Sequence, residues 1–346
     1  MINVAVIGFG MSAKVFHLPL ISDNEEFQLT AICTSQKQLV SEKYPAISIY
    51  SSIDELIKHS EVDLVIITTP NALHYNHTKL CLENDFHVIV EKPMTATSVE
   101  AEELVKLAEA NKLILSVFHN RRWDGDFLTV KKLLSNNALG EIRLFESNFD
   151  RFRPIVSDKW KEHPGPATGV WFDLGAHLVD QIICLFGLPV SLTARCLALR
   201  DDSKTTDYFH VQLHYPELEV ILHSSPYTVV QNSRFNIQGS KRCLVKHGLD
   251  IQEEQLKNGM LPSQKMFGED KPEYHATLYS NTSENDTTSE NIVTEHGDYK
   301  QFYCGIAHAI NHGEKVPVSG DDGVNVIKIL ELAVQSSKSG QTLILE

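Results

Sequence analysis

The chain has 346 residues, about twice the commonest size of a single domain, so two domains with a substantial hydrophobic core are expected. Apolar residues make up 42% and charged residues 22% of the chain, as in globular proteins and unlike disordered polyelectrolytes or membrane bundles. The formal net charge of −14 repels phosphate backbones and anionic lipid, so neither nucleic acid nor a membrane is expected as a partner.

The first third of the chain alternates strands rich in Val and Ile with helical stretches. Strands are predicted at Ile2–Ile7, Gln28–Cys33, Val62–Thr68, Phe86–Val90 and Leu113–Val117. Helices are predicted between them, at Ala13–Ile21, Ile53–Lys58, His74–Glu83 and Ser98–Asn111. Strict alternation implies right-handed crossovers and a parallel sheet covered on both faces. We expect this doubly wound domain to occupy residues 1–120.

From about Phe118 onward, strands follow one another after a single helix at Asp124–Ser135. They are predicted at Ile142–Phe149, Ser191–Leu199, Tyr208–Tyr215, Leu218–Ser224, Arg234–Gln238 and Cys243–His247. Successive strands without intervening helices indicate a mostly antiparallel sheet, here in a second domain at residues 121–346. Further helices are predicted at Gly169–Phe186, Tyr299–Asn311 and Asp321–Ser337. The fold class expected is therefore α/β plus α+β.

The N-terminus and the cysteines bear on location and metal binding. The first eight residues lack a basic region, and their apolar run is too short for a signal peptide or a membrane span, so a cytoplasmic protein is expected. The six cysteines have no C-x-x-C or other short paired spacing, which fits neither a zinc cage nor a disulfide framework.

A glycine-rich turn directly follows the first predicted strand. It reads Gly8-Phe9-Gly10-Met11-Ser12-Ala13, the G-x-G-x-x-A form of the dinucleotide fingerprint. Gly8 permits the tight turn, Gly10 lets the backbone approach a pyrophosphate, and Ala13 allows close packing of helix on strand. Because the motif ends a strand and opens a helix, it predicts dinucleotide binding; a generic tight turn is the alternative.

The end of the second predicted strand bears on the choice of dinucleotide. An NAD enzyme usually has Asp or Glu there, against the ribose 2′-hydroxyl. This chain has Cys33-Thr34-Ser35-Gln36-Lys37, with no acid. Lys37 would offset the charge of a 2′-phosphate, and Thr34 and Ser35 would donate hydrogen bonds, which favours NADP. The alternative is that these are ordinary solvated residues and that NAD is accepted as well.

A lysine follows the fourth predicted strand, in the sequence Glu91-Lys92-Pro93. This is the carboxyl edge of the sheet, where ligands bind in open α/β domains. Pro93 favours an extended or turn conformation of Lys92, so its ammonium can point into the crevice. Taken alone, a lysine at a strand end is more often a solvated surface charge.

The predicted helix Gly169–Phe186 has one narrow polar stripe. Asp173 and His177 lie one turn apart on that stripe, which also holds Asp180, Gln181 and Cys184. The helix contains no Lys, Arg or Glu and looks nearly buried all round. A solvent-facing stripe is the alternative, but a carboxylate paired with the one side chain that titrates near neutrality favours acid–base chemistry.

These three motifs, in this order and at these separations, resemble those of the Gfo/Idh/MocA family of nicotinamide oxidoreductases, over essentially the whole chain. Three more segments, Ser116–Asp124, Asp150–Pro154 and Thr206–His210, resemble the subgroup that contains NADP-dependent scyllo-inositol dehydrogenases. The resemblance implies hydride transfer between a cyclic polyol or sugar, with scyllo-inositol and its inosose as the leading pair, and the nicotinamide of NADP, or else of NAD.

The resemblance also implies roles for single residues. His177 would take the hydroxyl proton as hydride leaves, Asp173 would orient the substrate and support the imidazole, and Lys92 would hydrogen-bond the reacting oxygen. Arg121 matches a position near the substrate; a structural ion pair of Arg121 and Arg122 is the alternative. The matched cofactor positions are Thr69, Pro70, Asn71, His74, Glu91, Lys92 and Asn120.

The family works without metal, and His74 and His77 have no third ligand at a recognisable spacing, so no metal site is expected. In the family, the second domain supplies much of the substrate pocket and its open sheet face pairs with another subunit, which implies a homodimer or homotetramer. An aldose dehydrogenase is the closest rival. A non-catalytic nucleotide-sensing regulator is disfavoured because Lys92, Asp173 and His177 are all present. The third rival is a dehydratase or glycosidase that oxidises transiently with tightly held NAD.

Overall fold

The structure is a computed structural model that describes residues 1–59, 61–158, 160–283 and 286–345. By their internal contacts the residues form two compact units. We call the first the Rossmann unit; it comprises Met1–Asn120, Gln252–Phe267 and Asp298–Ile327. We call the second the sheet unit; it comprises Arg121–Ile251, Gly268–Gly297 and Lys328–Glu346. Both units are discontinuous in sequence, unlike the two continuous segments expected from the sequence.

The Rossmann unit is built on a six-stranded sheet in the order β3-β2-β1-β4-β5-β6, in which all neighbouring strands are parallel. The strands are β1 (Ile2–Ile7), β2 (Phe27–Cys33), β3 (Ser48–Tyr50), β4 (Leu64–Ile67), β5 (His87–Val90) and β6 (Leu115–Val117). Every residue of β4 is fully buried, because helices cover both faces of the sheet. The predicted parallel sheet is confirmed, and among its described strands only β3 was not predicted from the sequence.

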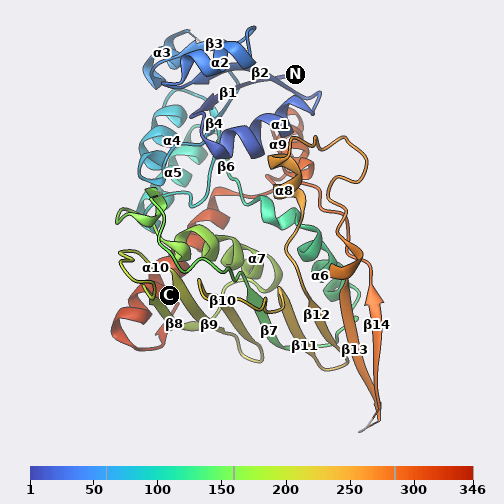
Figure 1. The fold of residues 1–346 in the computed structure, drawn as a ribbon. Coiled ribbons are helices and arrows are strands. Elements are labelled where there is room, and N and C mark those ends of the chain that lie inside the picture. Colours follow the sequence, from blue (N-terminus) through green and yellow to red (C-terminus); the bar gives the residue numbers. More distant parts are fainter. Residues whose placement is uncertain (60, 159, 284–285, 346) are drawn as a thin grey trace. The chain divides into compact units, whose positions relative to one another are not determined.

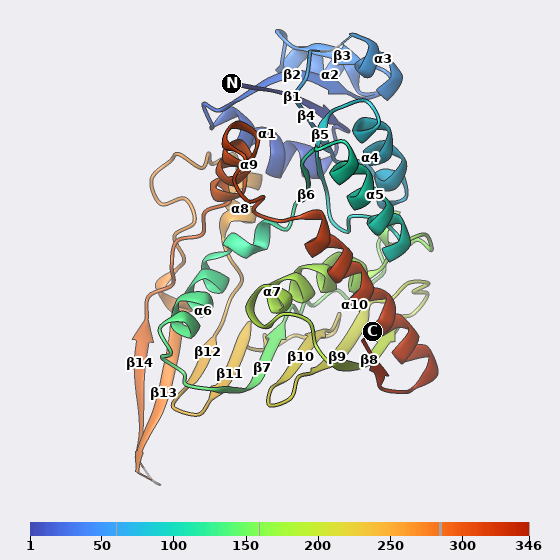
Figure 2. The ribbon, with the colours of Figure 1, turned by 180° about the vertical axis from the view of Figure 1, so that it is seen from behind.

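The helices of this unit lie on the two sides of its sheet. Figures 1 and 2 show α4 and α5 on one side and α1 and α9 on the other. The helical segments are η1 (Ala13–His17), α1 (Leu18–Ser22), α2 (Lys37–Lys43), α3 (Ile53–His59), η2 (Asn71–Leu73), α4 (His74–Leu82), α5 (Ser98–Ala110), the first residue of η3 (Asn120–Trp123), α8 (Gln252–Lys257), α9 (Lys300–His312) and the first part of α10 (Gly320–Ser339). The helix α9 adds the buried rings of Phe302 and Tyr303 to the core.

The sheet unit has nine strands in the order β14-β13-β12-β11-β7-β10-β9-β8-β15. They are β7 (Ile142–Asn148), β8 (Ser191–Leu197), β9 (Tyr208–His214), β10 (Glu219–Ser224), β11 (Phe235–Gly239), β12 (Cys243–Lys246), β13 (Ala276–Ser283), β14 (Asp286–Ile292) and β15 (Leu343–Ile344). Among the strands that the structure describes here, only the pair β7 and β10 is parallel. The predicted mostly antiparallel sheet is confirmed, although β13, β14 and β15 are not among the predicted strands.

One face of this sheet carries helices. In Figures 1 and 2, α6 (Gly125–Ser135) and α7 (Ala176–Phe186) lie on the same side of the strands. The shorter helical segments are η4 (Trp160–Glu162), η5 (Trp171–Gly175) and η6 (Pro272–Tyr274). Side chains of β9 alternate strictly: Phe209, Val211 and Leu213 are fully buried, whereas their neighbours are half-buried on the opposite face.

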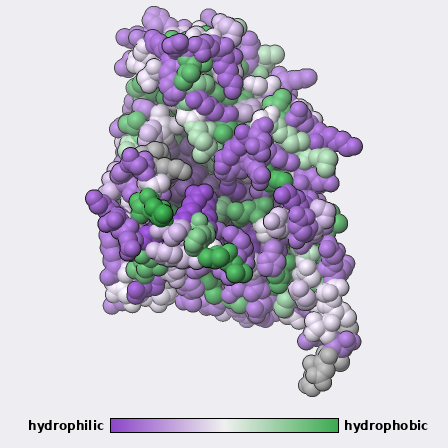
Figure 3. All heavy atoms as spheres, in the orientation of Figure 1, coloured by the Kyte–Doolittle hydropathy of each residue, from purple (hydrophilic) through white to green (hydrophobic). Residues whose placement is uncertain are grey.

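Hydrophilic side chains cover most of the face of the Rossmann unit seen in Figure 3, with hydrophobic side chains scattered among them. No helix within the part of the chain that the structure describes is both long enough and apolar enough to cross a membrane.

Candidate active site

The glycine-rich turn has the geometry that a dinucleotide needs. Gly8 follows β1 with φ +102°, and a Cβ there would lie 2.7 Å from Thr68 Oγ1 and 3.0 Å from the Thr68 carbonyl oxygen. A side chain at Gly8 is therefore excluded twice, by backbone conformation and by space. A Cβ at Gly10 would meet no atom within 4 Å, so the space above this backbone is open to a ligand. Ala13 is fully buried against the sheet. The turn fits a pyrophosphate.

The other residues of the fingerprint differ in exposure. Phe9 is buried, Met11 is exposed, and Ser12 is half-buried at the start of the π-helix η1. Lys14, which the sequence analysis did not single out, extends from η1 with its Nζ 4.4 Å from the centre of the Phe9 ring. The same Nζ lies 3.5 Å from Gln36 Oε1. An ammonium group therefore lies beside the segment after β2, where the sequence analysis expects the cofactor ribose.

The residues predicted to bind the ribose and its 2′ substituent lie just before α2 and at its first residue. The Thr34 hydroxyl accepts a 3.1 Å hydrogen bond from the Gln36 backbone N–H, which leaves its own O–H free to rotate toward a ligand. Ser35 and Lys37 are exposed. The structure thus brings two hydroxyls and two ammonium groups, those of Lys14 and Lys37, to the end of β2.

The predicted cofactor loop follows β4, and His74 holds it from within. His74 is fully buried, with Nε2 2.8 Å from the Thr69 carbonyl oxygen and Nδ1 2.8 Å from the Pro93 carbonyl oxygen. Burial lowers the pKa of His74, and the two carbonyl groups oppose that effect. In this loop Thr69 is half-buried, Pro70 is exposed and Asn71 is buried. His74 therefore links the loop after β4 to the turn after β5.

Glu91 lies at the end of β5 and joins three parts of the Rossmann unit. One carboxylate oxygen accepts hydrogen bonds from the Ser12 hydroxyl and, over 3.1 Å, from His17 Nε2. The other accepts the backbone N–H of Lys92 over 3.1 Å. Burial alone would raise the pKa of Glu91, but the hydrogen bond from His17, the electrostatic effects of His17 and Lys92 and the hydrogen bond from Ser12 lower it to about 2. Glu91 is therefore ionised at neutral pH. Asn120, the last predicted cofactor residue, is buried at the start of η3.

In the sheet unit, the polar stripe of the predicted helix lies mostly inside the protein. His177 is 7% exposed, and Asp180 and Gln181 are each 1% exposed. The solvent-facing alternative is therefore wrong for these three residues. The helix itself begins with a π-helical turn, η5, and continues as α7, a change of pitch that the spacing of apolar residues did not predict.

Three arginines, two of them buried, contact this stripe. Arg122 Nε and Nη2 donate to Asp180 over 2.9 and 2.7 Å. Gln181 donates to the Arg121 carbonyl oxygen over 2.8 Å and accepts from Arg234 over 2.8 Å. Arg121 itself pairs with a neighbouring carboxylate, that of Asp124, over 3.1 Å. Arg121 and Arg122 therefore form the structural ion pairs that were the alternative to a substrate contact, and substrate binding by Arg121 stays a prediction.

Asp173 has a partner that the sequence analysis missed. Lys161 Nζ lies 2.6 Å from Asp173 Oδ1, and both side chains are partly exposed. The two residues are twelve positions apart, and Lys161 lies in η4, which is too short to show a periodic pattern, so nothing in the sequence pointed to the pair. Of the predicted catalytic residues, Lys92 belongs to the Rossmann unit, whereas Asp173 and His177 belong to the sheet unit. Their assembly into one site is part of the function proposed below.

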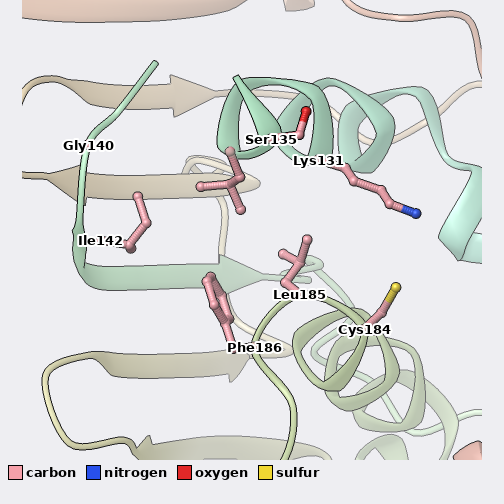
Figure 4. A pocket seen from close by; sticks show the side chains of 8 residues that line it. Lys131, Ser135, Gly140, Ile142, Cys184, Leu185 and Phe186 are labelled. Atoms are coloured by element: carbon pink, nitrogen blue, oxygen red, sulfur yellow. The ribbon is translucent and has the colours of Figure 1, made fainter. Parts of the chain in front are cut away.

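A hollow of about 420 Å³ lies elsewhere in the sheet unit. Figure 4 shows its lining residues, among them Lys131 and Ser135 of α6 and Cys184 and Phe186 at the end of α7. None of its lining residues is one of the predicted site residues. Across the described ranges, no group of three or more His, Cys, Asp or Glu side chains could hold a metal ion.

Comparison with known protein families shows to which family the chain belongs. The description "Oxidoreductase family, NAD-binding Rossmann fold" matches residues 2–119, and "Oxidoreductase family, C-terminal alpha/beta domain" matches residues 131–345, both of them Gfo/Idh/MocA domains. The chain belongs to the Gfo/Idh/MocA family. It is an oxidoreductase with an NAD-binding Rossmann domain, as the resemblance of its motifs predicted.

Full-length relatives of this Gfo/Idh/MocA protein are known. It is 40% identical over 345 residues to scyllo-inositol 2-dehydrogenase (NADP(+)) IolW of Bacillus subtilis, covering 100% of this chain and 96% of the relative. It is 41% identical over 344 residues to the uncharacterized oxidoreductase YdgJ of Escherichia coli, covering 99% of each. The solved structure of the oxidoreductase yvaA from Bacillus subtilis has a TM-score of 0.96 and 40% identity, and the match covers 100% of this chain and 98% of that one.

Proposed function

We propose that this protein is an NADP-dependent dehydrogenase that oxidises one CH–OH group of a cyclic polyol, with scyllo-inositol as the leading substrate and an inosose as the product. The observation that carries the proposal is the 40% identity, along the whole chain, to an enzyme named for that reaction. A second relative of the same name, IolU of Bacillus subtilis, is 30% identical over 235 residues, covering 64% of this chain and 69% of the relative.

The bound nicotinamide supplies the hydride acceptor. The residues of this chain handle the proton and the developing charge: His177 takes the hydroxyl proton as the carbinol carbon loses hydride, so a secondary alcohol becomes a ketone and the imidazole becomes an imidazolium. Histidine is the side chain whose charge ordinarily changes near neutral pH, which suits this transfer. The Lys92 ammonium stabilises negative charge on the reacting oxygen.

The surroundings of His177 and Asp173 support these roles. His177 lies in a helix whose other faces are apolar and whose nearby carboxylate, Asp180, is already paired with Arg122. Asp173 is partly exposed and can reach a substrate hydroxyl, and the Lys161 ammonium holds its carboxylate in place. Substrate binding by Arg121 is part of the proposal, because Arg121 matches a position near the substrate in the family.

The preference for NADP follows from charge. An adenosine 2′-phosphate adds about two negative charges, and Lys37 and Lys14 place two positive charges at the end of β2. Thr34 and Ser35 add hydroxyl donors in the same segment. No acid stands in Cys33–Lys37 to bind the unmodified 2′-hydroxyl of NAD.

We also propose that the enzyme works as a homodimer or homotetramer. The face of the nine-stranded sheet opposite α6 and α7 carries half-buried side chains, among them Tyr208, His210 and Ile221. A broad sheet face of mixed polarity is suited to pairing with a second copy of itself. Size-exclusion chromatography with light scattering tests this, and a monomer at micromolar concentration would contradict it.

The deciding experiment is a spectrophotometric screen of inositol isomers and aldoses with NADP⁺ and NAD⁺. We expect scyllo-inositol and NADP⁺ to give the highest kcat/KM. Preference for an aldose would favour the sugar dehydrogenase instead; a partial relative is D-glucoside 3-dehydrogenase of Escherichia coli, 29% identical over 196 residues that cover 54% of this chain and 55% of the relative. Tightly bound dinucleotide without net nicotinamide reduction would favour transient oxidation, and binding without any turnover would favour a regulator.

A further inference from the structure

A buried chain of three polar side chains crosses the Rossmann unit. Tyr303 in α9, His17 at the end of η1 and Glu91 after β5 are hydrogen-bonded in that order. The Tyr303 hydroxyl lies 2.6 Å from His17 Nδ1, and His17 Nε2 lies 3.1 Å from Glu91 Oε1. His17 and Tyr303 are fully buried, and neither has a part in the mechanism above.

Chemistry fixes the direction of the hydrogen bond between His17 and Glu91. Glu91 is ionised and can only accept, so His17 Nε2 must carry a proton. Burial raises the pKa of Tyr303 well above 10, so Tyr303 remains a phenol at neutral pH. Its hydroxyl holds Nδ1 on the opposite side of the ring from the nitrogen that meets Glu91. Tyr303 therefore determines which His17 nitrogen faces Glu91.

Aromatic packing immobilises the imidazole. The Phe118 ring centre lies 4.2 Å from that of His17, and Phe302 packs edge-on against Phe118 at 4.9 Å. His17 is also the last residue of the π-helical turn that follows the glycine-rich loop. Such turns are rare and occur often at functional sites.

The Glu91 carboxylate is where this chain meets the site. Besides His17, it accepts the hydroxyl of Ser12, within the phosphate-binding turn, and the backbone N–H of Lys92. We propose that His17 and Tyr303 are positioning residues that fix the Glu91 carboxylate and, through it, both the conformation of the dinucleotide turn and the direction of Lys92. This inference rests on the proposed dehydrogenase function and assigns that site a shared support for cofactor and catalytic lysine.

The expected effects follow from losing one donor to a buried carboxylate, which leaves Glu91 short of a hydrogen bond and free to turn. Removing His17 should weaken dinucleotide binding through Ser12 and lower kcat through Lys92, each by about tenfold or more, as supporting residues around active sites typically do. The KM for the polyol should change little, because neither His17 nor Tyr303 touches it.

The test compares His17→Leu, His17→Gln and Tyr303→Phe. A Gln amide can restore a donor to Glu91, so His17→Gln should recover much of what His17→Leu loses, and Tyr303→Phe should fall between them. Matched controls come from the sheet unit: His214 lies between the Thr193 hydroxyl at 3.0 Å and the Glu219 carboxylate at 2.7 Å, and the Tyr215 hydroxyl donates to the Gly187 carbonyl oxygen over 2.8 Å. The variants His214→Leu and Tyr215→Phe remove the same kinds of hydrogen bond away from Glu91.

The readouts are the NADPH dissociation constant by fluorescence titration without polyol, then kcat and KM, and the melting temperature. Unchanged NADPH affinity and kcat in His17→Leu and Tyr303→Phe, or a fall in melting temperature alone as in the controls, would overturn the inference. If His17→Leu does not fold, Tyr303→Phe decides by the same readouts. Wild-type protein that binds neither dinucleotide would overturn the proposed function and this inference with it; wild-type binding with unaffected variants would overturn the inference alone.

Discussion

The Arg122 guanidinium holds the Asp180 carboxylate through two nitrogens, Nε at 2.9 Å and Nη2 at 2.7 Å. The Arg122 side chain is 12% exposed and that of Asp180 is 2% exposed. The pair joins the segment that opens the sheet unit to α7, the helix that carries His177. Planar two-point contacts of this kind fix orientation as well as charge.

Removing one member of this pair should therefore destabilise the protein strongly. We expect Arg122→Ala to lower the free energy of unfolding by about 3–5 kcal/mol, because a buried carboxylate is left without its counter-charge. Lys132→Ala, which breaks the exposed pair with Glu295, should change it by no more than about 1 kcal/mol. Urea unfolding of both variants provides the measurement. Equal losses of unfolding free energy would show that the Arg122–Asp180 pair stabilises the protein no more than the exposed pair does.

Substitution of His177 should separate chemistry from binding. His177→Ala is expected to reduce kcat by about 10²- to 10⁴-fold, because the group that takes the hydroxyl proton is lost. NADPH affinity should stay close to that of the wild type, as a fluorescence titration would show. Retained turnover would remove His177 from the mechanism.

Charge at the end of β2 should control cofactor preference. Lys37→Ala is expected to raise the KM for NADP⁺ about tenfold, the value of one favourable charge contact of roughly 1.4 kcal/mol, and to leave the KM for NAD⁺ nearly unchanged. Lys14→Ala should act in the same direction. Steady-state kinetics with both cofactors tests this; equal effects on NADP⁺ and NAD⁺ would contradict a 2′-phosphate site.

The ionised state of Glu91 should appear in the acid stability of the protein. Its pKa is lowered from 4.5 to about 2, so the native state binds this proton less readily than the unfolded chain. The stability that it contributes is present above about pH 4.5 and is lost as the pH falls toward 2. Glu91→Gln should thus flatten the decline in unfolding free energy between pH 5 and pH 3.

Glu103→Gln is the control for that measurement, because Glu103 is exposed and pairs with Lys79 on the surface. Its acid profile should follow the wild type closely. A Glu91→Gln profile that also follows the wild type would contradict the lowered pKa of Glu91.

A chelator should leave turnover unchanged. Proton transfer by His177 and charge stabilisation by Lys92 need no Lewis acid. His74 could pair with His77 to bind a metal, but both ring nitrogens of His74 already contact backbone carbonyl oxygens. The measurement is kcat/KM after dialysis against EDTA. Inactivation that zinc or magnesium restores would contradict this prediction.

The sequence predicted the local features well, because each depends on neighbouring residues. The strand Ile2–Ile7 and the turn after it are where the pattern placed them, since an apolar run followed by Gly8 and Gly10 has few other conformations. The short edge strand Ser48–Tyr50 was not predicted, because three residues are too few to show an alternation of apolar and polar side chains. The strand β14 was not predicted because it is polar and mostly exposed, and β13 was not predicted because its apolar positions end after Tyr279.

The residues around the site were harder to predict than its motifs. Glu91 and Lys92 were visible as a strand end, but the partners of Glu91 depend on contacts between distant positions. His17 and Tyr303 are 286 positions apart, and no spacing rule joins them. The partner of Asp173, Lys161, lies in the three-residue helical segment η4. Tertiary packing creates both relationships, so a single sequence does not contain them in readable form.

The aromatic contacts of α9 have a consequence for how the protein is made. Phe118 lies near the end of the first 120 residues, but its ring packs on those of Phe302 and Tyr303, which are synthesised much later. On the ribosome, the nucleotide-binding half therefore emerges with an incomplete core and exposes apolar rings until α9 has been synthesised. Folding of this half must wait for nearly the whole chain, which makes the nascent protein a natural client for chaperones.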